Sequence, residues 1–205
     1  MRVDGGRDRG DRPTRPGGDS VIMSGVLVIE MNDDAVAALG VLTGQLPLYL
    51  PGKLTPGLEL IVGNGIVRRG DVLVWTESFG QALGAPGEHR DLTSWECADS
   101  RFNLEDAVPV AMEIVDDALV ISEANQRRLL AYALAFTMRV AQLANNLTPP
   151  ASVRCIITAN ETNATFRFHQ IRPGQRWHAP DLDSYTQDKL IVIDIRQPTA
   201  AAPSS

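Results

Sequence analysis

The chain has 205 residues, of which 44% are hydrophobic and 21% are charged, and its formal net charge is −6 with a pI of about 5.0. This length and composition are sufficient to bury one substantial core. The acidic balance and the lack of a polybasic run disfavour nucleic acid and anionic membranes as partners, and a basic or polar ligand surface fits the charge better.

The first 24 residues consist mainly of Gly, Pro, Arg and Asp and contain almost nothing apolar. Burial therefore offers no gain to offset the entropy of ordering them. We expect a disordered extension over residues 1–24, with Met23 as an alternative start, a single domain over 25–196, and a disordered tail over 197–205.

The domain opens with a strand and a short helix. Residues 25–31 (GVLVIEM) are enriched in Val and Ile, which favours a strand. Asn32 or Asp33 then provides a cap for a helix through Leu42, which Gly44 ends.

A small meander is predicted next. The apolar runs 58–62 and 66–68 flank Asn64-Gly65, a pair typical of a two-residue hairpin turn. Residues 71–75 predict a third strand.

The pattern is weaker between this meander and the middle of the chain. Thr76 is suited to cap a short helix to about residue 83, and the Gly-, Pro- and polar-rich run 85–103 is typical of a long surface loop. Two strands, 108–115 and 118–121, are expected on either side of Asp116-Asp117, with a helix after Pro109 as the alternative for the first.

One long helix dominates the second half. Ser122 is a suitable N-cap, and apolar residues recur at helical spacing from residue 123 to residue 146. They form a stripe too wide for a single contact, so we expect this helix to pack across a sheet and against another helix.

A β-hairpin follows the long helix. Residues 153–159 and 165–171 both alternate apolar and polar side chains, and the polar run 161–164 lies between them. Pairing across this turn places Phe166 and Phe168 on one apolar face, together with Cys155 and its neighbours at alternate positions. The other face is polar.

Pairing Asn160 with Thr165 sets the predicted register and places Thr158 opposite Arg167. A third strand is expected at residues 189–195, which are rich in Ile and Val. This order of elements predicts an α+β fold, with a largely antiparallel mixed sheet packed by one long helix (about 123–146) and one or two short helices, rather than a doubly wound fold.

The polar face of the 153–171 hairpin is the candidate ligand- or partner-binding surface. Arginines beside a histidine are suited to hold a carboxylate or a phosphate through bidentate hydrogen bonds. The alternative is an ordinary solvated sheet face. The candidate residues are Arg154, Thr158, Asn160, Arg167, His169 and Arg172.

Two other groups of residues are candidates for a chemical site. Cys97 and His89 are the only cysteine–histidine pair close in sequence, but unpaired cysteines usually just pack in a core. His178, Asp181 and Asp183 have a spacing that a loop could gather round a divalent cation, although such aspartates more often begin a turn. We therefore assign no catalytic residue, no metal ligand and no cofactor.

The two cysteines, Cys97 and Cys155, are too few for a disulfide framework, so the default location is the reducing cytoplasm. The most apolar run is shorter than the ~20 residues that cross a membrane, and no secretory signal pattern begins the chain.

These patterns favour a soluble, non-catalytic domain that binds a protein partner, of the inhibitor, immunity or adaptor type. The first alternative is a small-molecule enzyme or anion-binding protein that uses the polar face of the hairpin. The second is a structural subunit of a homo-oligomer, since the wide face of the long helix would also serve a homodimer.

Overall fold

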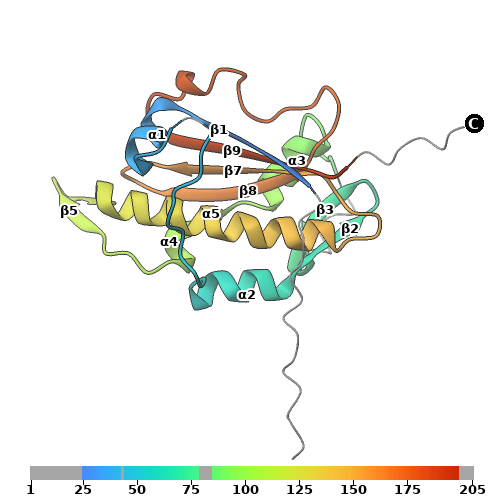
Figure 1. Cartoon of the computed structure of the whole chain (residues 1–205), viewed down its shortest axis with the longest axis horizontal. Coiled ribbons are helices and arrows are strands. Elements are labelled where there is room, and N and C mark those ends of the chain that lie inside the picture. Colours follow the sequence, from blue (N-terminus) through green and yellow to red (C-terminus); the bar gives the residue numbers. More distant parts are fainter. Residues whose placement is uncertain (1–24, 43, 79–84, 199–205) are drawn as a thin grey trace, which may run out of the picture.

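A computed structural model describes residues 25–42, 44–78 and 85–198 (Figure 1). The protein has an α+β fold, in which one long helix packs against a five-stranded antiparallel sheet, as the sequence predicts. The expected N-terminal extension, most of the expected tail, and most of the helix predicted over 76–83 lie outside the described residues.

The strands of the sheet are ordered β1-β9-β7-β8-β4, and all neighbours are antiparallel. The predicted hairpin and the predicted last strand form its middle, because β7 pairs with both β8 and β9. The strands are β1 (Val26–Met31), β4 (Phe102–Asn103), β7 (Val153–Ala159), β8 (Ala164–Gln170) and β9 (Lys189–Arg196).

The register of the hairpin differs from the prediction by two residues. Thr165 lies opposite Thr158 rather than Asn160. The cause is Asn160, whose side-chain oxygen accepts hydrogen bonds from the amides of Thr162 and Asn163 and so closes a turn that begins one residue earlier than expected. A slip of two residues leaves every side chain on its predicted face.

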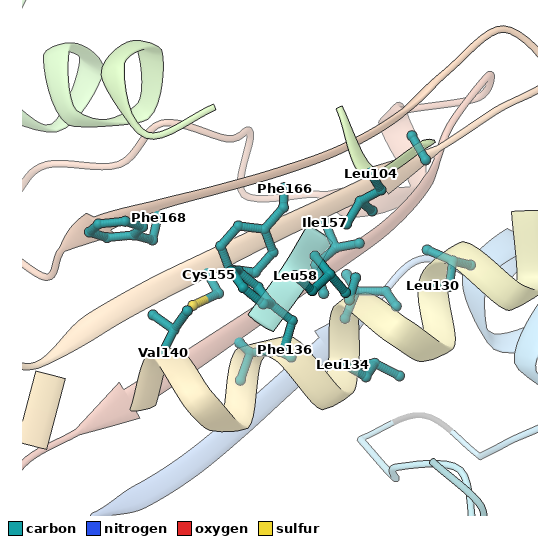
Figure 2. Close-up of a cluster of buried hydrophobic side chains, with 14 of the residues drawn as sticks. Leu58, Leu104, Leu130, Leu134, Phe136, Val140, Cys155, Ile157, Phe166 and Phe168 are labelled. Atoms are coloured by element: carbon teal, nitrogen blue, oxygen red, sulfur yellow. The ribbon is translucent and has the colours of Figure 1, made fainter. Parts of the chain in front are cut away.

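Helix α5 (Glu123–Asn145) covers the apolar face of the sheet, and the main core lies between the two (Figure 2). Phe136 on the helix meets Phe166 on β8 edge-on, with 4.8 Å between ring centroids. Cys155 and Phe168 are fully buried in the same layer, as the alternation predicts.

The other sides of α5 contact α1 (Asp33–Leu39) and α2 (Pro56–Asn64), which confirms that its wide apolar stripe packs against further helices. Helix α1 ends earlier than expected, because Gly40 adopts a left-handed conformation with φ 65°.

The strand predicted over residues 58–62 is wrong, because this run lies in α2. The hydroxyl of Thr55 accepts a hydrogen bond from the amide of Leu58, and Pro56 occupies the first turn, which are both helix-start signals. Gly65, with φ 76°, ends the helix, so it is not the corner of a hairpin. The hairpin of this region is instead formed by β2 (Ile66–Arg69) and β3 (Val72–Trp75).

The long loop predicted over residues 85–103 is also wrong. It contains α3 (Leu92–Asp99), which begins where the carboxylate of Asp91 accepts a hydrogen bond from the amide of Ser94, and it ends in β4. After the short α4 (Leu104–Ala107), the two expected strands are present in shortened form as β5 (Glu113–Val115) and β6 (Ala118–Val120).

Candidate functional site

The predicted polar face of the hairpin is covered by another part of the chain. It is therefore neither an open binding surface nor a solvated sheet face, and both expectations were wrong on this point. Residues 171–188, the cover segment, run over this face on the side of the sheet opposite α5 (Figure 1). Arg154 is 7% exposed and His169 is 0% exposed. Polar groups buried in this way need hydrogen-bond or ion-pair partners.

Arg154 forms a buried bidentate ion pair with Asp194 on β9. The distances from its Nε and Nη2 to the two carboxylate oxygens are 2.5 and 2.8 Å. Its Nη1 lies 3.3 Å from Nε2 of His178, which belongs to the cover segment. Arg196 donates to the same carboxylate. Arg154 therefore connects β7 to β9 and to the cover segment.

This ion pair predicts a specific loss of stability in acid. Burial alone would raise the pKa of Asp194, but hydrogen bonds from Arg154 and Arg196 outweigh it and hold the pKa below its ordinary value. A depressed folded-state pKa contributes stability above the unfolded-state value of about 4, and that contribution is lost as the pH falls through the folded-state value. Thermal melts from pH 6 to pH 2 should therefore fall more steeply for the wild type than for Asp194→Asn. Equal slopes would contradict this role for the pair.

Arg172 forms the second buried ion pair, with Glu96 on α3. Its Nη1 and Nη2 donate to the two carboxylate oxygens at 2.6 and 2.8 Å, and the Glu96 side chain is 0% exposed. The same carboxylate accepts the backbone amides of Leu73 at 2.6 Å and Gln170 at 2.8 Å. Glu96 therefore joins β3, β8 and the cover segment to α3, and Arg172 is its counter-ion.

Arg167 and His169 are the two candidates with unsatisfied atoms. The Arg167 guanidinium stacks over the ring of Trp177 at 4.1 Å and donates to Thr165 at 3.3 Å, while its Nε has no hydrogen-bond partner. Nε2 of His169 also lacks a partner, and burial lowers the pKa of this imidazole to about 4, so it is neutral at physiological pH. Trp177 belongs to the cover segment and is itself half-buried.

Thr158 and Asn160 have structural contacts at the turn end of the hairpin. Thr158 Oγ1 lies 2.8 Å from Thr165 Oγ1, and the side-chain Nδ2 of Asn160 donates to the carboxylate of Asp188 at 2.7 Å. Asn160 also lines a polar cleft of about 390 Å³ beside the start of α5. The positively charged residue of this cleft, Lys189, already donates hydrogen bonds to Glu123 and Gln126. The structure thus groups Arg154, Arg167 and His169 on one face and places Asn160 at its end.

Cys97 has the surroundings of a packed thiol rather than a nucleophile. It is 0% exposed among Ile156, Leu190 and Val192, and burial raises its pKa to about 12. His89 lies on the surface. The packed alternative is therefore the one that the structure supports.

The three residues considered for a cation site make separate contacts. His178 lies against Arg154, Asp181 caps the short 3₁₀ helix Leu182–Ser184, and Asp183 accepts the amide of Asp33. Within the described ranges, no three His, Cys, Asp or Glu side chains gather as a metal site.

The structure also places an apolar surface where the sequence indicated only two strands. β5 and β6 form a hairpin, which we call the arm (Met112–Val120), that extends beyond the sheet and the start of α5 (Figure 1). Ile114 and Leu119 lie directly opposite each other on it and are 75% and 61% exposed. Alternation predicts strands, but it does not tell whether a strand joins the main sheet, so this exposure could not be predicted from the sequence.

The arm has a defined turn and an anchored base. Asp116 and Asp117 have φ of 49° and 64°, the left-handed pair that tight hairpins require. Asn125 on α5 donates to the carbonyl of Ala111 at 2.7 Å, immediately before the arm. Two-stranded hairpins are marginal in water when nothing packs on them. An arm with exposed Ile and Leu side chains therefore has the character of an interaction surface.

Comparisons with known proteins give a family. Residues 51–202 match the model of the family described as Uncharacterized protein PM0498 family, which is three quarters of the chain. The chain belongs to this family. The match covers the arm, α5 and the hairpin with its cover segment, so these features lie in the family's own region. No curated protein and no solved structure matches the chain. None of the helices within the described ranges is long and apolar enough to cross a membrane.

Proposed function

We propose that the protein is a soluble, cytoplasmic, non-catalytic domain of the inhibitor, immunity or adaptor type, which binds a partner protein through the arm. The observation that carries this proposal is the exposed Ile114–Leu119 pair on a hairpin that projects from the domain. Val115 and Met112 of the arm are exposed as well, at 49% and 39%. Exposed apolar side chains gathered on one projecting element are typical of protein-binding surfaces.

The partner surface is expected to be basic around an apolar groove. Residues 102–126, which include the arm, contain six Asp or Glu residues and no Lys or Arg. In a two-fold dimer built on this surface, the same acidic patch would occur on both sides and repel itself. This charge favours a different, basic protein over a second copy of the chain.

The two alternatives have less support. An anion-binding function has in its favour the unpaired Nε of Arg167, but Trp177 covers the guanidinium and the neighbouring Arg154 is already paired. A homo-oligomer formed through the wide face of α5 would need that face to be free, and α1 and α2 pack against it.

The test compares the wild type with two variants of the full chain. Ile114→Ser with Leu119→Ser removes the apolar tip of the arm, and Leu60→Ser, at a 68% exposed position on α2, is the matched control. Exposed substitutions of this kind should change stability by only ~0.5 kcal/mol, whereas loss of interface anchors should cost ~2 kcal/mol or more, or about 30-fold in Kd. Quantitative co-purification from producing cells should recover a basic partner with the wild type and with Leu60→Ser, and much less of it with the arm variant. Binding measured with the purified partner should be equally tight for the wild type and Leu60→Ser and about 30-fold weaker for the arm variant.

Equal binding by the arm variant would contradict the proposal. A wild type that dimerises by itself, with an arm variant that is monomeric, would also contradict it, because the occupant would then be a second copy.

A further inference from the structure

A second surface feature is a cleft of about 240 Å³ where the end of α2, the end of β3, α3 and β4 meet. Its apolar wall consists of Ile61, Trp75 and Phe102. The Trp75 indole donates to the carbonyl of Ser100 at 3.1 Å and meets Phe168 edge-on at 4.9 Å, so its position is fixed by the core. The wall is therefore formed before any ligand arrives.

Asp99 lines this cleft, in surroundings that disfavour its negative charge. It is the last residue of α3, where the helix dipole disfavours negative charge. Its Oδ2 is buried and has no hydrogen-bond partner. Burial raises the pKa of Asp99, and the nearby charge of Glu96 raises it further, against a hydrogen bond from Ser78. A carboxyl group whose charged form is disfavoured by its surroundings and that lines a cleft is a candidate binding group.

The neighbouring polar groups do not neutralise Asp99. Arg101, the base that lines the same cleft, donates to Asn103 at 3.4 Å. Asn64 donates to Glu77, the second carboxylate of the cleft. Among the described residues Asp99 has no ion pair. The cleft is thus lined by two carboxylates, Asp99 and Glu77, and by an apolar wall, while the guanidinium of Arg101 is hydrogen-bonded to Asn103.

We infer that this cleft binds a primary ammonium or guanidinium group on a short apolar stem, with the stem against Trp75 and Phe102 and the cation at Asp99. The cleft is smaller than the ~300 Å³ at which drug-sized pockets begin, which suits a small free amine or a single Lys or Arg side chain. This site is separate from the arm and does not depend on the function proposed for it.

The probes are n-butylammonium and its neutral counterpart n-butanol, titrated into the full chain while the NMR signal of the Trp75 indole N–H is followed. The ammonium should shift this signal to saturation, and butanol should not. Asp99→Asn should weaken the ammonium about tenfold or more, as expected for a lost hydrogen bond to a charged group. Asp34→Asn, an exposed acid on α1, is the matched control and should leave the affinity unchanged.

A third variant moves the affinity the other way. Arg101→Gln removes the base that lines the cleft and should strengthen ammonium binding, which a merely structural role of Asp99 would not predict. Nα-acetyl-lysine amide tells whether the natural ligand is a peptide side chain or a small free amine. If this compound binds, the cleft accepts a lysine side chain of a peptide, and if only butylammonium binds, the cleft is restricted to free amines. Equal shifts with butanol, no saturable shift, or full affinity in Asp99→Asn would each overturn the inference.

Discussion

Replacement of Glu96 by alanine is expected to destabilise the protein by ~3–5 kcal/mol, the usual cost of breaking a buried ion pair from one side. The Arg172 side chain, 12% exposed, would lose its counter-ion. The amides of Leu73 and Gln170 would lose their acceptor as well, and each unsatisfied buried group adds a desolvation cost. The free energy of unfolding from urea titration measures this effect.

Glu96→Gln is the informative companion, because its side-chain oxygen still accepts one of these hydrogen bonds while the charge is gone. It should fall between the wild type and Glu96→Ala. A loss below 1 kcal/mol in Glu96→Ala, within the range of exposed pairs, would show that Glu96 does not hold α3, β3 and the cover segment together.

Phe136→Ala is expected to cost ~3–5 kcal/mol through lost burial and the cavity that it leaves. The Phe136 ring is 0% exposed and lies 4.8 to 6.0 Å from three other aromatic rings, those of Phe166, Phe102 and Trp75. Figure 2 shows it pointing from α5 into the core. Leu60→Ala, on the exposed side of α2, is the control and should remain within ~0.5 kcal/mol of the wild type in the same titration. Similar small losses for both variants would mean that α5 does not pack on the sheet as described.

The elements with a strong local pattern could be predicted from sequence. The long helix has an unbroken helical spacing of apolar residues, and the 153–171 hairpin alternates cleanly, so the type of each element and its buried face were correct. The run 58–62 was not decidable by pattern, because a short apolar segment suits a strand or a buried helix turn equally well. The Thr55-Pro56 start signal before it pointed to the helix.

The environment of the candidate site could not be predicted, because it depends on segments far apart in the chain. Alternation gave the right polar face, but whether that face is solvated depends on the cover segment and α3, which pack on it from residues 171–188 and 92–99. The partner of Arg154 is Asp194, 40 residues away, and that of Arg172 is Glu96, 76 residues away. No local spacing rule connects such pairs.

Exposure of the arm has the same origin. The apolar residues within 113–120 predict two strands, and only the tertiary structure shows that these strands pair with each other and, among the described residues, with no strand of the five-stranded sheet. The acidic composition of residues 102–126 was readable from the sequence, yet it gains meaning only beside these exposed apolar side chains.

The most direct test of the proposed protein-binding function is photo-crosslinking in producing cells, with a photoreactive amino acid in place of Ile114 on the arm and, separately, in place of Leu60 on α2. Both positions are exposed, so the two proteins should fold alike and differ only in what lies against the label. The account predicts one discrete crosslinked product with a basic protein from position 114 and none from position 60. No product from position 114, or the same products from both positions, would contradict it.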